Sequence, residues 1–594
     1  MSRIILGWQL NRPIGDARIH GLMEEVERRY QPLFLERLRS VGLWREGQGL
    51  LHVDVARGGD AGLELSDDRI CCRTGRPTAA EPESGAAGPL GAAALYDRLV
   101  SPTGSVRPDA IATVTPPFTF CWFDRRSARI GVVHDGLGLD QFFVSLTPAG
   151  VVFSNRYWPI LRLTGEPPTL DAEAWRHWFC LGWFPDLSAP VRNVRALGSG
   201  EILVGDSRVV TSSSAGALSR WIEQGTGGDP AILMPRAAEA VRNLIHRNRP
   251  AEGGFEADLT GGLDSRAICA VLTHEGFRCR YYTGGSRWSA EVVLARRIAS
   301  QLGLEWTHAD DRGPADPGDL SGLVENRLRR FTLWCEGLVQ PRRLCAFPDS
   351  PAPTSDGVYL GGGSSEISRG PYYRQTLRRN SAAAFDLDGA AAALARPARD
   401  LLAAPDEAAL ADRMRHWLGE GAARGLGGWA LIDHWYLHQK VRRWQAAHLA
   451  ANLFDGDVLP FVNAEHIALA FAMSPVAKVE SEFQRFIIQR HAPAILRVPV
   501  TSEDHRSRYV QVLRWLDRVR NRRSNAGWMG YVRGPGRASV ERVLSSGGPV
   551  WEILDRDRAM RSWHAFVQGT NPDLNFPLAL LVFSSWHTAL IEGS

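Results

Sequence analysis

The pattern of apolar and polar positions changes character near residue 230. Before that point, short apolar stretches recur between turn residues, which predicts a mainly β region with few helices. A helix is predicted over 171–181, where Trp175, Trp178 and Phe179 fall on one side and Asp171 is placed as the N-cap. The stretches that indicate strands are 51–55, 130–133, 141–144, 151–153 and 202–204.

Beyond residue 230 the pattern predicts strands that alternate with helices. Helices are expected over 231–247 and 290–302. Such alternation predicts a parallel sheet, and ligands bind at the carboxyl ends of the strands in these sheets. From Ala382 onward the chain is expected to be almost entirely helical, with a buried terminal helix over 576–586. The predicted strands lie near 255–259, 281–284, 305–309 and 357–360.

The length of 594 residues is too great for one core, so two or three domains are expected. A low-complexity stretch, Thr211–Leu218, and a Gly-rich one, Gln224–Pro230, mark the connection between them. We therefore predict a domain over 1–210, a linker over 211–230 and a second domain over 231–594.

The composition of the chain argues against some classes of binding partner. A net charge of +4 is small for this length, so neither a nucleic-acid nor a membrane partner is predicted. The Arg-rich segment 506–523 is interpreted as a solvated helix face, because no aromatic platform alternates with its arginines. No apolar run has the length of a membrane span, and no signal pattern opens the chain. Eight cysteines without metal-binding spacing indicate reduced thiols and a cytoplasmic location.

The strongest chemical signal is the stretch 258–266, Asp-Leu-Thr-Gly-Gly-Leu-Asp-Ser-Arg. It lies between a predicted strand and a predicted helix, where backbone N–H groups and the helix dipole converge on an anion. Gly261 and Gly262 let the backbone approach a phosphate, and Thr260 and Ser265 add hydroxyl donors. Asp264 would repel a phosphate unless a cation lay between them, so it is predicted to bind Mg²⁺. Glycines alone would indicate only a turn; the fixed offsets of Asp264 and Ser265 favour a phosphate site.

This loop resembles the Ser-Gly-Gly-x-Asp-Ser loop of the ATP pyrophosphatases that adenylate their substrates, with Thr260 in place of the first serine. Across nearly the whole chain, the order of motifs is similar to that of the asparagine synthetase superfamily. The other stretches that resemble family motifs are 135–139 with 142–143, 153–156, 183–185 with 198–200, 361–366, 440–443, and 459–463 with Lys478 beyond it.

The resemblance implies a fold of the α/β plus α+β class. The N-terminal domain, 1–210, would be an Ntn-hydrolase-like sandwich related to class II glutamine amidotransferases. The C-terminal domain, 231–594, would hold an adenine-nucleotide α-hydrolase-like parallel sheet with a helical C-terminal part. The implied ligands are ATP and Mg²⁺.

Departures from the family pattern bear on function. Glutamine-using members have cysteine at position 2, where this chain has Ser2, so the glutaminase domain is expected to be inactive. In the second motif, Gly362 stands where the family has Glu, and Ser365 stands where the family has the usual Mg²⁺-binding Asp. Glu366 is retained. The β-lactam-forming members have tyrosine at the place of Gly362. The lysine expected after residues 495–497 is also missing.

Site roles follow from these comparisons. Asp264 and Glu366 are the predicted metal ligands. A purely structural role is the alternative for Glu366. Arg497, His505, Arg506 or Lys440 would replace the missing lysine, and only Lys440 and Lys478 are lysines in this chain. Glu291 is a candidate for a substrate or metal contact, although an ordinary acidic residue in a first helical turn fits equally well. The predicted nucleotide contacts are Leu259, Thr260, Gly261, Gly262, Leu263, Asp264, Ser265, Gly284, Gly361 and Gly362, and the predicted catalytic residues are Asp264, Ser265, Glu366, Arg497 and Lys440.

The predicted activity is that of an AMP-forming amide ligase. The favoured substrate is a precursor peptide whose own amine attacks an activated Asp or Glu side chain, as in lasso-peptide cyclases, with a leader-binding protein and a protease as implied partners. β-lactam synthetase-like ligases, other small-molecule ligases and an asparagine synthetase-like enzyme using free ammonia remain alternatives. So do an enzyme that adenylates tRNA or a nucleotide and a degenerate scaffold that binds ATP or peptide without catalysis.

Overall fold

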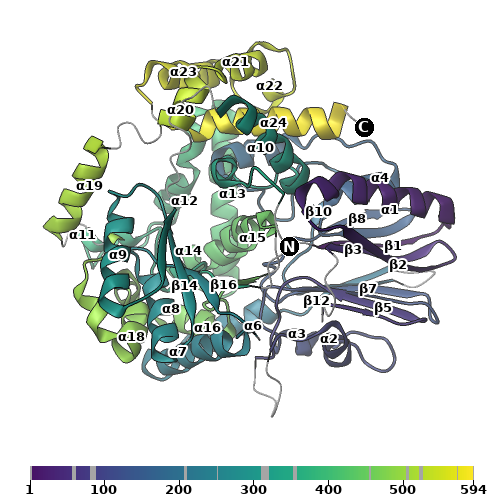
Figure 1. The fold of residues 1–594 in the computed structure, drawn as a ribbon, viewed down its shortest axis with the longest axis horizontal. Coiled ribbons are helices and arrows are strands. Elements are labelled where there is room, and N and C mark those ends of the chain that lie inside the picture. The colour runs from purple at the N-terminus through teal and green to yellow at the C-terminus, as the bar shows by residue number, and fades with distance from the viewer. Residues whose placement is uncertain are drawn as a thin grey trace.

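The structure of the chain, a computed structural model, describes residues 3–55, 62–80, 88–205, 210–250, 252–309, 320–351, 357–453, 456–502, 507–520, 526–571 and 573–592. Its N-terminal part contains two antiparallel sheets stacked face to face, and its C-terminal part contains a parallel sheet surrounded by helices (Figure 1). This arrangement agrees with the predicted succession of a β-rich region and an α/β region.

The first antiparallel sheet has six strands within the described residues. One of its inner strands begins at Arg3, at the start of the described chain. It pairs on one side with the strand over 48–55 and on the other side with the strand over 150–154, about 150 residues further along the chain. In order across the sheet the strands are β10 (Arg195–Ala196), β8 (Phe143–Thr147), β9 (Gly150–Ser154), β1 (Arg3–Leu10), β3 (Gln48–Val55) and β2 (Leu38–Arg45).

The second antiparallel sheet faces the first across a layer of buried apolar side chains, which includes Ile5, Phe153, Phe123 and Val132. Alternate residues of each strand point into this layer, as the period of two requires. In order across the sheet the strands are β12 (Val210–Ser214), β11 (Glu201–Gly205), β7 (Arg129–His134), β6 (Thr119–Asp124), β5 (Arg69–Arg73) and β4 (Leu63–Leu65).

Helices cover the outer faces of both sheets, so the N-terminal part has four layers (Figure 1). Helices α1 (Asp16–Tyr30) and α4 (Tyr157–Thr164) pack on the first sheet through residues such as Ile19 and Ile160. Helices α2 (Ala92–Leu99) and α3 (Pro108–Ile111) cover the second sheet through Leu95 and Ile111. Helix α5 (Ala172–Leu181) begins after Asp171, whose carboxylate accepts a hydrogen bond from the Ala174 N–H, as predicted for an N-cap.

The predicted linker, 211–230, contains regular structure. Strand β12 occupies its start, and helix α6 (Ala217–Gly225) follows. Leu218 and Trp221 of α6 are buried, and the helix packs against α16 (Ala464–Ala472) in the C-terminal part. The segment therefore joins the two parts as a packed strand and helix, and the domain boundaries remain a prediction.

The parallel sheet has the strand order β15 (Trp306–Ala309), β14 (Cys279–Gly284), β13 (Phe255–Asp258), β16 (Val358–Leu360) and β17 (Asp457–Val458). The first four strands were predicted. The two-residue β17 was missed, because so short a strand within a helical region has no apolar period of its own. Helices α7 (Pro230–Arg247), α8 (Leu263–His274), α9 (Ala290–Leu302) and α18 (Glu482–His491) share a buried apolar core with this sheet.

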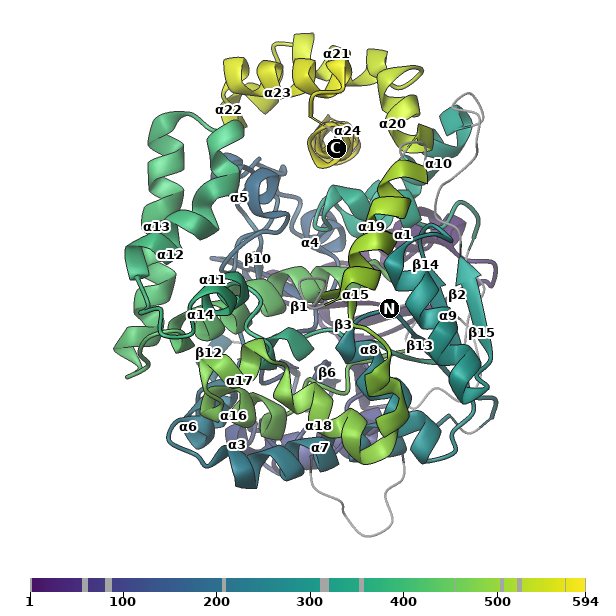
Figure 2. The same cartoon turned by 90° about the vertical axis from the view of Figure 1, so that its left-hand side faces the viewer.

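The described residues from Ala382 onward are almost entirely helical, as predicted, and further helices lie between residues 320 and 379. The last α-helix, α24 (Asn575–His587), is buried along most of its length and lies across the top of the molecule beneath α21 and α23 (Figure 2). The other helices of this region are α10 (Leu320–Cys335), η2 (Pro341–Ala346), η3 (Ser365–Ser368), α11 (Arg374–Arg379), α12 (Leu387–Ala395), η4 (Arg396–Asp400), α13 (Ala404–Ala423), α14 (Ala430–Trp435), η5 (Tyr436–Gln445), α15 (Ala446–Ala451), α17 (Pro475–Val479), η6 (Pro493–Arg497), α19 (Arg508–Arg520), α20 (Ala526–Arg533), α21 (Arg537–Ser545), α22 (Val550–Ile553), α23 (Arg556–Gln568) and η8 (Thr588–Glu592).

Helix α19 corresponds to the Arg-rich segment. Val510 and Leu513 of this helix are buried against the core of the parallel sheet. The face turned to solvent carries Tyr509, Val512, Trp515 and Val519, each roughly half exposed, so it is more apolar than the predicted solvated face.

No helix among the described residues combines the length and apolar character that crossing a membrane requires. All eight cysteines are free thiols, in agreement with the prediction from their spacing.

Candidate functional site

The strand order of the parallel sheet creates a topological switch point between β13 and β16. From β13 the chain proceeds outward through β14 to β15, and it then returns to β16 on the opposite side of β13. The connections that leave β13 and β16 therefore diverge, and a crevice for a ligand forms at this position in open α/β sheets. The loop after β13 is the predicted phosphate loop, and the loop after β16 is the second motif.

The phosphate loop is a tight turn that leads directly into α8. The Thr260 N–H donates to Ser265 Oγ at 3.0 Å, and the Gly262 N–H donates to Thr260 Oγ1 at 3.0 Å. The N–H of Gly261 donates to Glu291 Oε2 at 2.6 Å. The predicted loop residues Thr260 and Ser265 therefore shape the turn, and Glu291, a candidate from the sequence, lies against it.

Arg266 fixes the loop from behind. Its fully buried guanidinium donates to the carbonyl oxygens of Gly261 at 2.9 Å, Val498 at 2.7 Å and Pro499 at 2.6 Å. The Thr501 N–H donates to the same Gly261 carbonyl at 3.0 Å. Because the Gly261 carbonyl is held inward in this way, the turn is pre-formed before any ligand binds. This role of Arg266 was not predicted, although the residue directly follows Ser265 in the motif.

The second motif meets the loop where the sequence predicted. A Cβ built on Gly362 would lie 3.2 Å from Cβ of Asp264, so the two backbones are adjacent. Ser364 has a φ of 66°, a left-handed conformation that costs a residue with a Cβ about 1–2 kcal/mol. The hydroxyls of Ser364 and Ser365 and Oδ1 of Asp264 are buried and make no hydrogen bond within the described chain. Three polar oxygens without partners thus cluster at the crevice.

An ion pair lies between the two motifs. Nη1 of Arg369 pairs with Oδ2 of Asp264, and both side chains are less than a fifth exposed. Removal from water alone would lower the pKa of Arg369, but the negative charges of Asp264 and Glu366 outweigh this effect and raise it. Burial, followed by the charge of Asp264, raises the pKa of Glu366. Arg369 was not predicted, and it interacts electrostatically with both predicted metal ligands.

Distant side chains hold the second motif in place. His466 Nε2 lies 2.9 Å from Ser368 Oγ, and Gln484 Nε2 donates to the Ser365 carbonyl at 3.2 Å. Burial lowers the pKa of His466 to about 4, so its ring is neutral. Because Nδ1 lies 2.6 Å from the Phe461 carbonyl oxygen, which can only accept, Nδ1 carries the proton and Nε2 accepts from the Ser368 hydroxyl. These contacts join η3 to α16 and α18.

Lys440 lies beside the site on η5, a π-helix, which is a feature often found at functional sites. Its ammonium is 5.0 Å from the ring centre of Tyr372, 6.0 Å from that of Tyr436 and 5.2 Å from that of Trp444. Burial lowers its pKa, an effect that Glu366 opposes. Tyr436 donates to Glu366 Oε2 at 3.0 Å, which connects the aromatic cage of Lys440 to the second motif.

The remaining predicted residues lie in varied positions. Leu263 is buried at the start of α8, and Gly361 closes β16 with its N–H donating to the Val458 carbonyl at 3.0 Å. Leu259 is wholly buried, so its side chain belongs to the core and only its backbone faces the loop. Gly284 is exposed at the end of β14, and a Cβ there would meet no atom within 4 Å.

Two further cations are the predicted Arg497 and Lys478, the lysine of the motif resemblance. Arg497 ends η6 with an exposed side chain. The ammonium of Lys478 is buried at 2.5 Å from Asp433 Oδ2, so it is neutralised inside the helical part. His505 and Arg506 lie outside the described residues.

The stretch 135–139 of the N-terminal sandwich, which resembles a family motif, has a structural role. Asp135 accepts hydrogen bonds from five backbone N–H groups, those of Phe118, Leu137, Gly138, Leu139 and Asp140. The carboxylate thus fixes the turn between β7 and β8. Ser2, the basis for predicting an inactive glutaminase, lies outside the described residues.

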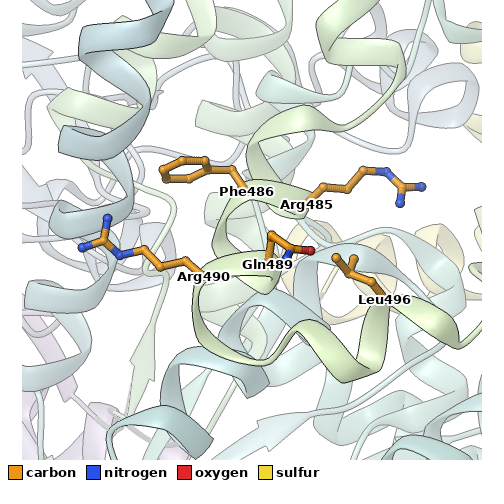
Figure 3. Close-up of a pocket in the computed structure, with 5 residues that line it drawn as sticks. All are labelled: Arg485, Phe486, Gln489, Arg490 and Leu496. Carbon is orange, nitrogen blue, oxygen red and sulfur yellow. The ribbon is translucent and has the colours of Figure 1, made fainter.

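A separate hollow of about 430 Å³ lies on the outer side of α18 and is lined by Arg485, Phe486, Gln489, Arg490 and Leu496. The side chains of Arg485 and Arg490 point in opposite directions there, so no set of polar groups converges (Figure 3). No group of three or more His, Cys, Asp and Glu side chains that could hold a metal ion occurs within the described ranges. The switch point therefore remains the better candidate.

Comparisons with known proteins add little. No protein-family model matches the sequence, and no curated protein matches it. One similar solved structure is the glutamine phosphoribosylpyrophosphate amidotransferase from B. subtilis complexed with ADP and GMP, with 8% identity, 52% of this chain and 65% of that chain covered, and a TM-score of 0.23. Another is described as the allosteric regulatory enzyme of purine biosynthesis, with 10% identity, 52% and 64% covered, and a TM-score of 0.24. The chain spans just under two thirds of either protein, and superpositions this loose imply nothing about its fold or chemistry.

Proposed function

We propose that the chain is an ATP-dependent, AMP-forming carbon–nitrogen ligase. The observation that supports this is the meeting of an anion-binding loop, Asp264 and the Glu366 motif at the switch point of a parallel sheet. The same observation supports the resemblance to the asparagine synthetase superfamily, with an Ntn-hydrolase-like N-terminal sandwich.

The proposed reaction has two steps. A carboxylate oxygen of the substrate attacks the α-phosphorus of ATP, the bond from that phosphorus to the α,β-bridging oxygen breaks, and pyrophosphate leaves. An amine then attacks the carbonyl carbon of the acyl-adenylate, AMP leaves with the bonding electron pair, and the nitrogen loses a proton. The products are an amide, AMP and pyrophosphate.

The chain's own residues would act mainly by positioning and by neutralising charge. The N–H groups from Gly261 to Ser265 and the dipole of α8 would bind the pyrophosphate oxygens. Arg369 and Lys440 are the described cations next to the second motif, and they would take the place of the missing lysine. Arg497 would need its exposed side chain to turn toward the loop to contribute.

The residues also fit Mg²⁺. This ion prefers one or two carboxylates together with substrate phosphates, and Asp264 Oδ1 and Ser365 Oγ are buried oxygens without partners in the described chain. Asp264 and Glu366 would hold it, and when bound it would neutralise charge on the leaving pyrophosphate.

For the substrate, we favour a precursor peptide whose own amine closes a macrolactam on an activated Asp or Glu side chain. The support is the sequence: Ser2 replaces the nucleophilic cysteine of glutamine-using relatives, so no internal ammonia source is expected. A leader-binding protein and a protease would be partners of such a lasso-type cyclase. A small-molecule ligase that uses free ammonia or another amine shares the same site.

The proposal is tested by pyrophosphate release from ATP and Mg²⁺ in the presence of candidate acids and precursor peptides. We expect release with the wild type and its loss in Asp264→Ala. The matched control is Asp388→Ala, which removes an exposed carboxylate paired with Arg415 far from the loop in sequence and should leave the rate unchanged. No release with any acceptor would favour a non-catalytic scaffold, and release that depends on glutamine would contradict the interpretation of Ser2.

A further inference from the structure

The ion pair between Arg369 and Asp264 places a fixed cation where the sequence predicted only metal. The guanidinium of Arg369 is 12% exposed and the carboxylate of Asp264 is 18% exposed, so the pair is largely shielded from water. One oxygen of Asp264 faces Arg369 and the other has no hydrogen-bond partner in the described chain. Asp264 can therefore keep one cation and still offer an oxygen to another.

The charges around the crevice are too few for two divalent ions. Asp264, Glu366 and Glu291 supply three negative charges, and Arg369 and Lys440 return two positive charges. Ser365, in the place of a further acidic ligand in the resemblance, is neutral and fully buried. Buried charges need a compensating partner. The net negative charge of these side chains can compensate at most one Mg²⁺, apart from the negative charge that the phosphates of the nucleotide contribute.

The loop already holds an anion at the position expected for phosphate. The carboxylate of Glu291 accepts from the Gly261 N–H at 2.6 Å, beside the hydroxyl of Thr501. A carboxylate oxygen and a phosphate oxygen make the same kind of hydrogen bond to an N–H group. The Gly261 N–H and Oδ2 of Asp264 are thus each paired internally with a group of the charge that the ligand would carry.

We propose that Arg369 is a pyrophosphate-binding residue that takes the place of a second metal ion. On binding of ATP or pyrophosphate, its guanidinium passes from Asp264 to a phosphate oxygen, and Asp264 becomes free to hold a single divalent cation. Phosphate displaces Glu291 from the Gly261 N–H in the same event. This inference depends on the proposed nucleotide site and adds its metal stoichiometry and its cationic residue.

The test counts metal ions and measures affinity without any turnover. Electron paramagnetic resonance of Mn²⁺ with the full chain and α,β-methylene-ATP should show one bound Mn²⁺ per chain. Isothermal titration with inorganic pyrophosphate and Mg²⁺ should show that Arg369→Ala weakens binding about 10- to 100-fold, the range expected for losing a charge-assisted hydrogen bond. The pyrophosphate affinity of Arg369→Lys should lie between those of the wild type and Arg369→Ala, since lysine keeps the positive charge but lacks the two parallel N–H donors of the guanidinium.

The affinity for Mn²⁺ without nucleotide is a second measurement, and Arg369→Ala should raise it while lowering the affinity for pyrophosphate. Without nucleotide, Arg369→Ala should bind Mn²⁺ more tightly than the wild type, because Asp264 has lost its competing cation. Misfolding cannot produce tighter metal binding together with weaker pyrophosphate binding. The control variant Arg327→Ala removes another partly buried Arg–Asp pair, that with Asp349, and should change neither value.

Two results would overturn the inference while leaving the proposed function intact. One is two bound Mn²⁺ per chain in the presence of α,β-methylene-ATP. The other is unchanged pyrophosphate affinity in a folded Arg369→Ala protein. If the wild type binds neither pyrophosphate nor the ATP analogue, the proposed function fails, and the inference fails with it.

Discussion

Gly261 has neighbours on every side at the tightest point of the loop. Its N–H donates to Glu291, and its carbonyl accepts from Arg266 and Thr501. A Cβ at this position would overlap the side-chain methyl of Thr501 and lie 3.0 Å from Glu291 Oε2. The absence of a side chain is therefore a steric requirement of the pre-formed turn.

Gly261→Ala should move Thr501 away from the loop and disorder the anion site. We expect a stability loss of about 1–3 kcal/mol, typical of overpacking, and at least a tenfold weaker affinity for ATP analogues. Thermal denaturation and isothermal titration measure the two effects. Gly427→Ala is the matched control, because nothing lies within 4 Å of its Cβ and it lies outside the predicted site; equal losses in both variants would contradict the steric explanation.

The two lysines should differ sharply in chemical reactivity. Lys440 is partly exposed within its aromatic cage, whereas Lys478 is 2% exposed and paired with Asp433. Only the neutral amine is acylated, and burial lowers the pKa of Lys440, so its labelling should rise at a lower pH than that of an ordinary lysine. Acetylation with peptide mass spectrometry should find Lys440 modified and Lys478 unmodified, and α,β-methylene-ATP should slow the reaction. Equal labelling of both would refute this placement.

At this scale the sequence predicted roles for the loop residues and Glu366, which remain predictions, and it gave no sign of the contacts that Arg369 and Arg266 make. The loop was recognisable because its defining residues, Gly261, Gly262, Asp264 and Ser265, lie within a few positions of one another, at offsets that chemistry dictates. Arg369 meets Asp264 across 105 residues, and its position depends on η3, which His466 and Gln484 hold from still further along the chain. No local pattern encodes a contact set by three distant elements.

Among the elements, the π-helix η5 serves both halves of the molecule. One side presents Tyr436 and Lys440 to the second motif. The other side contacts Asp186 of the N-terminal part, where Gln439 donates to Oδ1 at 2.8 Å and accepts from the backbone N–H at 2.9 Å. The sequence predicted only a helix here, because apolar spacing does not distinguish a π-helix from an α-helix.

Helices α14 and α17 are joined by the buried pair of Asp433 and Lys478, whose side chains are about 4% and 3% exposed. Replacing Lys478 alone leaves a buried carboxylate without its cation, so Lys478→Met should cost about 3–5 kcal/mol in the free energy of unfolding. The double variant Lys478→Met/Asp433→Leu removes both charges and should recover most of that loss. Urea denaturation measures both values, and an additive loss in the double variant would show that the pair itself is not the cause.

For the molecule as a whole, one of the four buried clusters among the described residues extends across the predicted boundary between domains, whereas the other three do not cross it. Trp175 of the N-terminal part lies 4.6 Å, between ring centres, from Trp586 of the last α-helix. One continuous buried cluster contains both residues together with Trp8 and Trp334. Composition marked 211–230 as a change of region, but it could not reveal how much apolar surface the two regions bury against each other.

Glu336 shows how closely the two halves are joined. This fully buried residue, with a φ of 50°, accepts hydrogen bonds from the backbone N–H groups of Tyr157 at 3.0 Å and Trp158 at 3.1 Å. It thereby satisfies donors at the start of α4 that have no partner within the helix. The Tyr157 hydroxyl donates in return to the Glu336 carbonyl at 2.6 Å. Burial raises the pKa of Glu336, and the charges of Arg156 and Arg29 together with these N–H donors oppose that rise.

The two halves should therefore unfold together. We expect one urea transition, with the same midpoint by circular dichroism, which reports on both halves, and by release of a fluorescent ATP analogue, which reports on the loop. Glu336→Ala should shift both midpoints equally, because the start of α4 would be left with buried unsatisfied N–H groups at a cost of about 1–3 kcal/mol each. A fragment ending at residue 210 should aggregate, since it would expose Trp175 and its apolar neighbours. Two separate transitions, or a stable monomeric fragment, would show instead that the halves are independent domains and that the shared core contributes little to either.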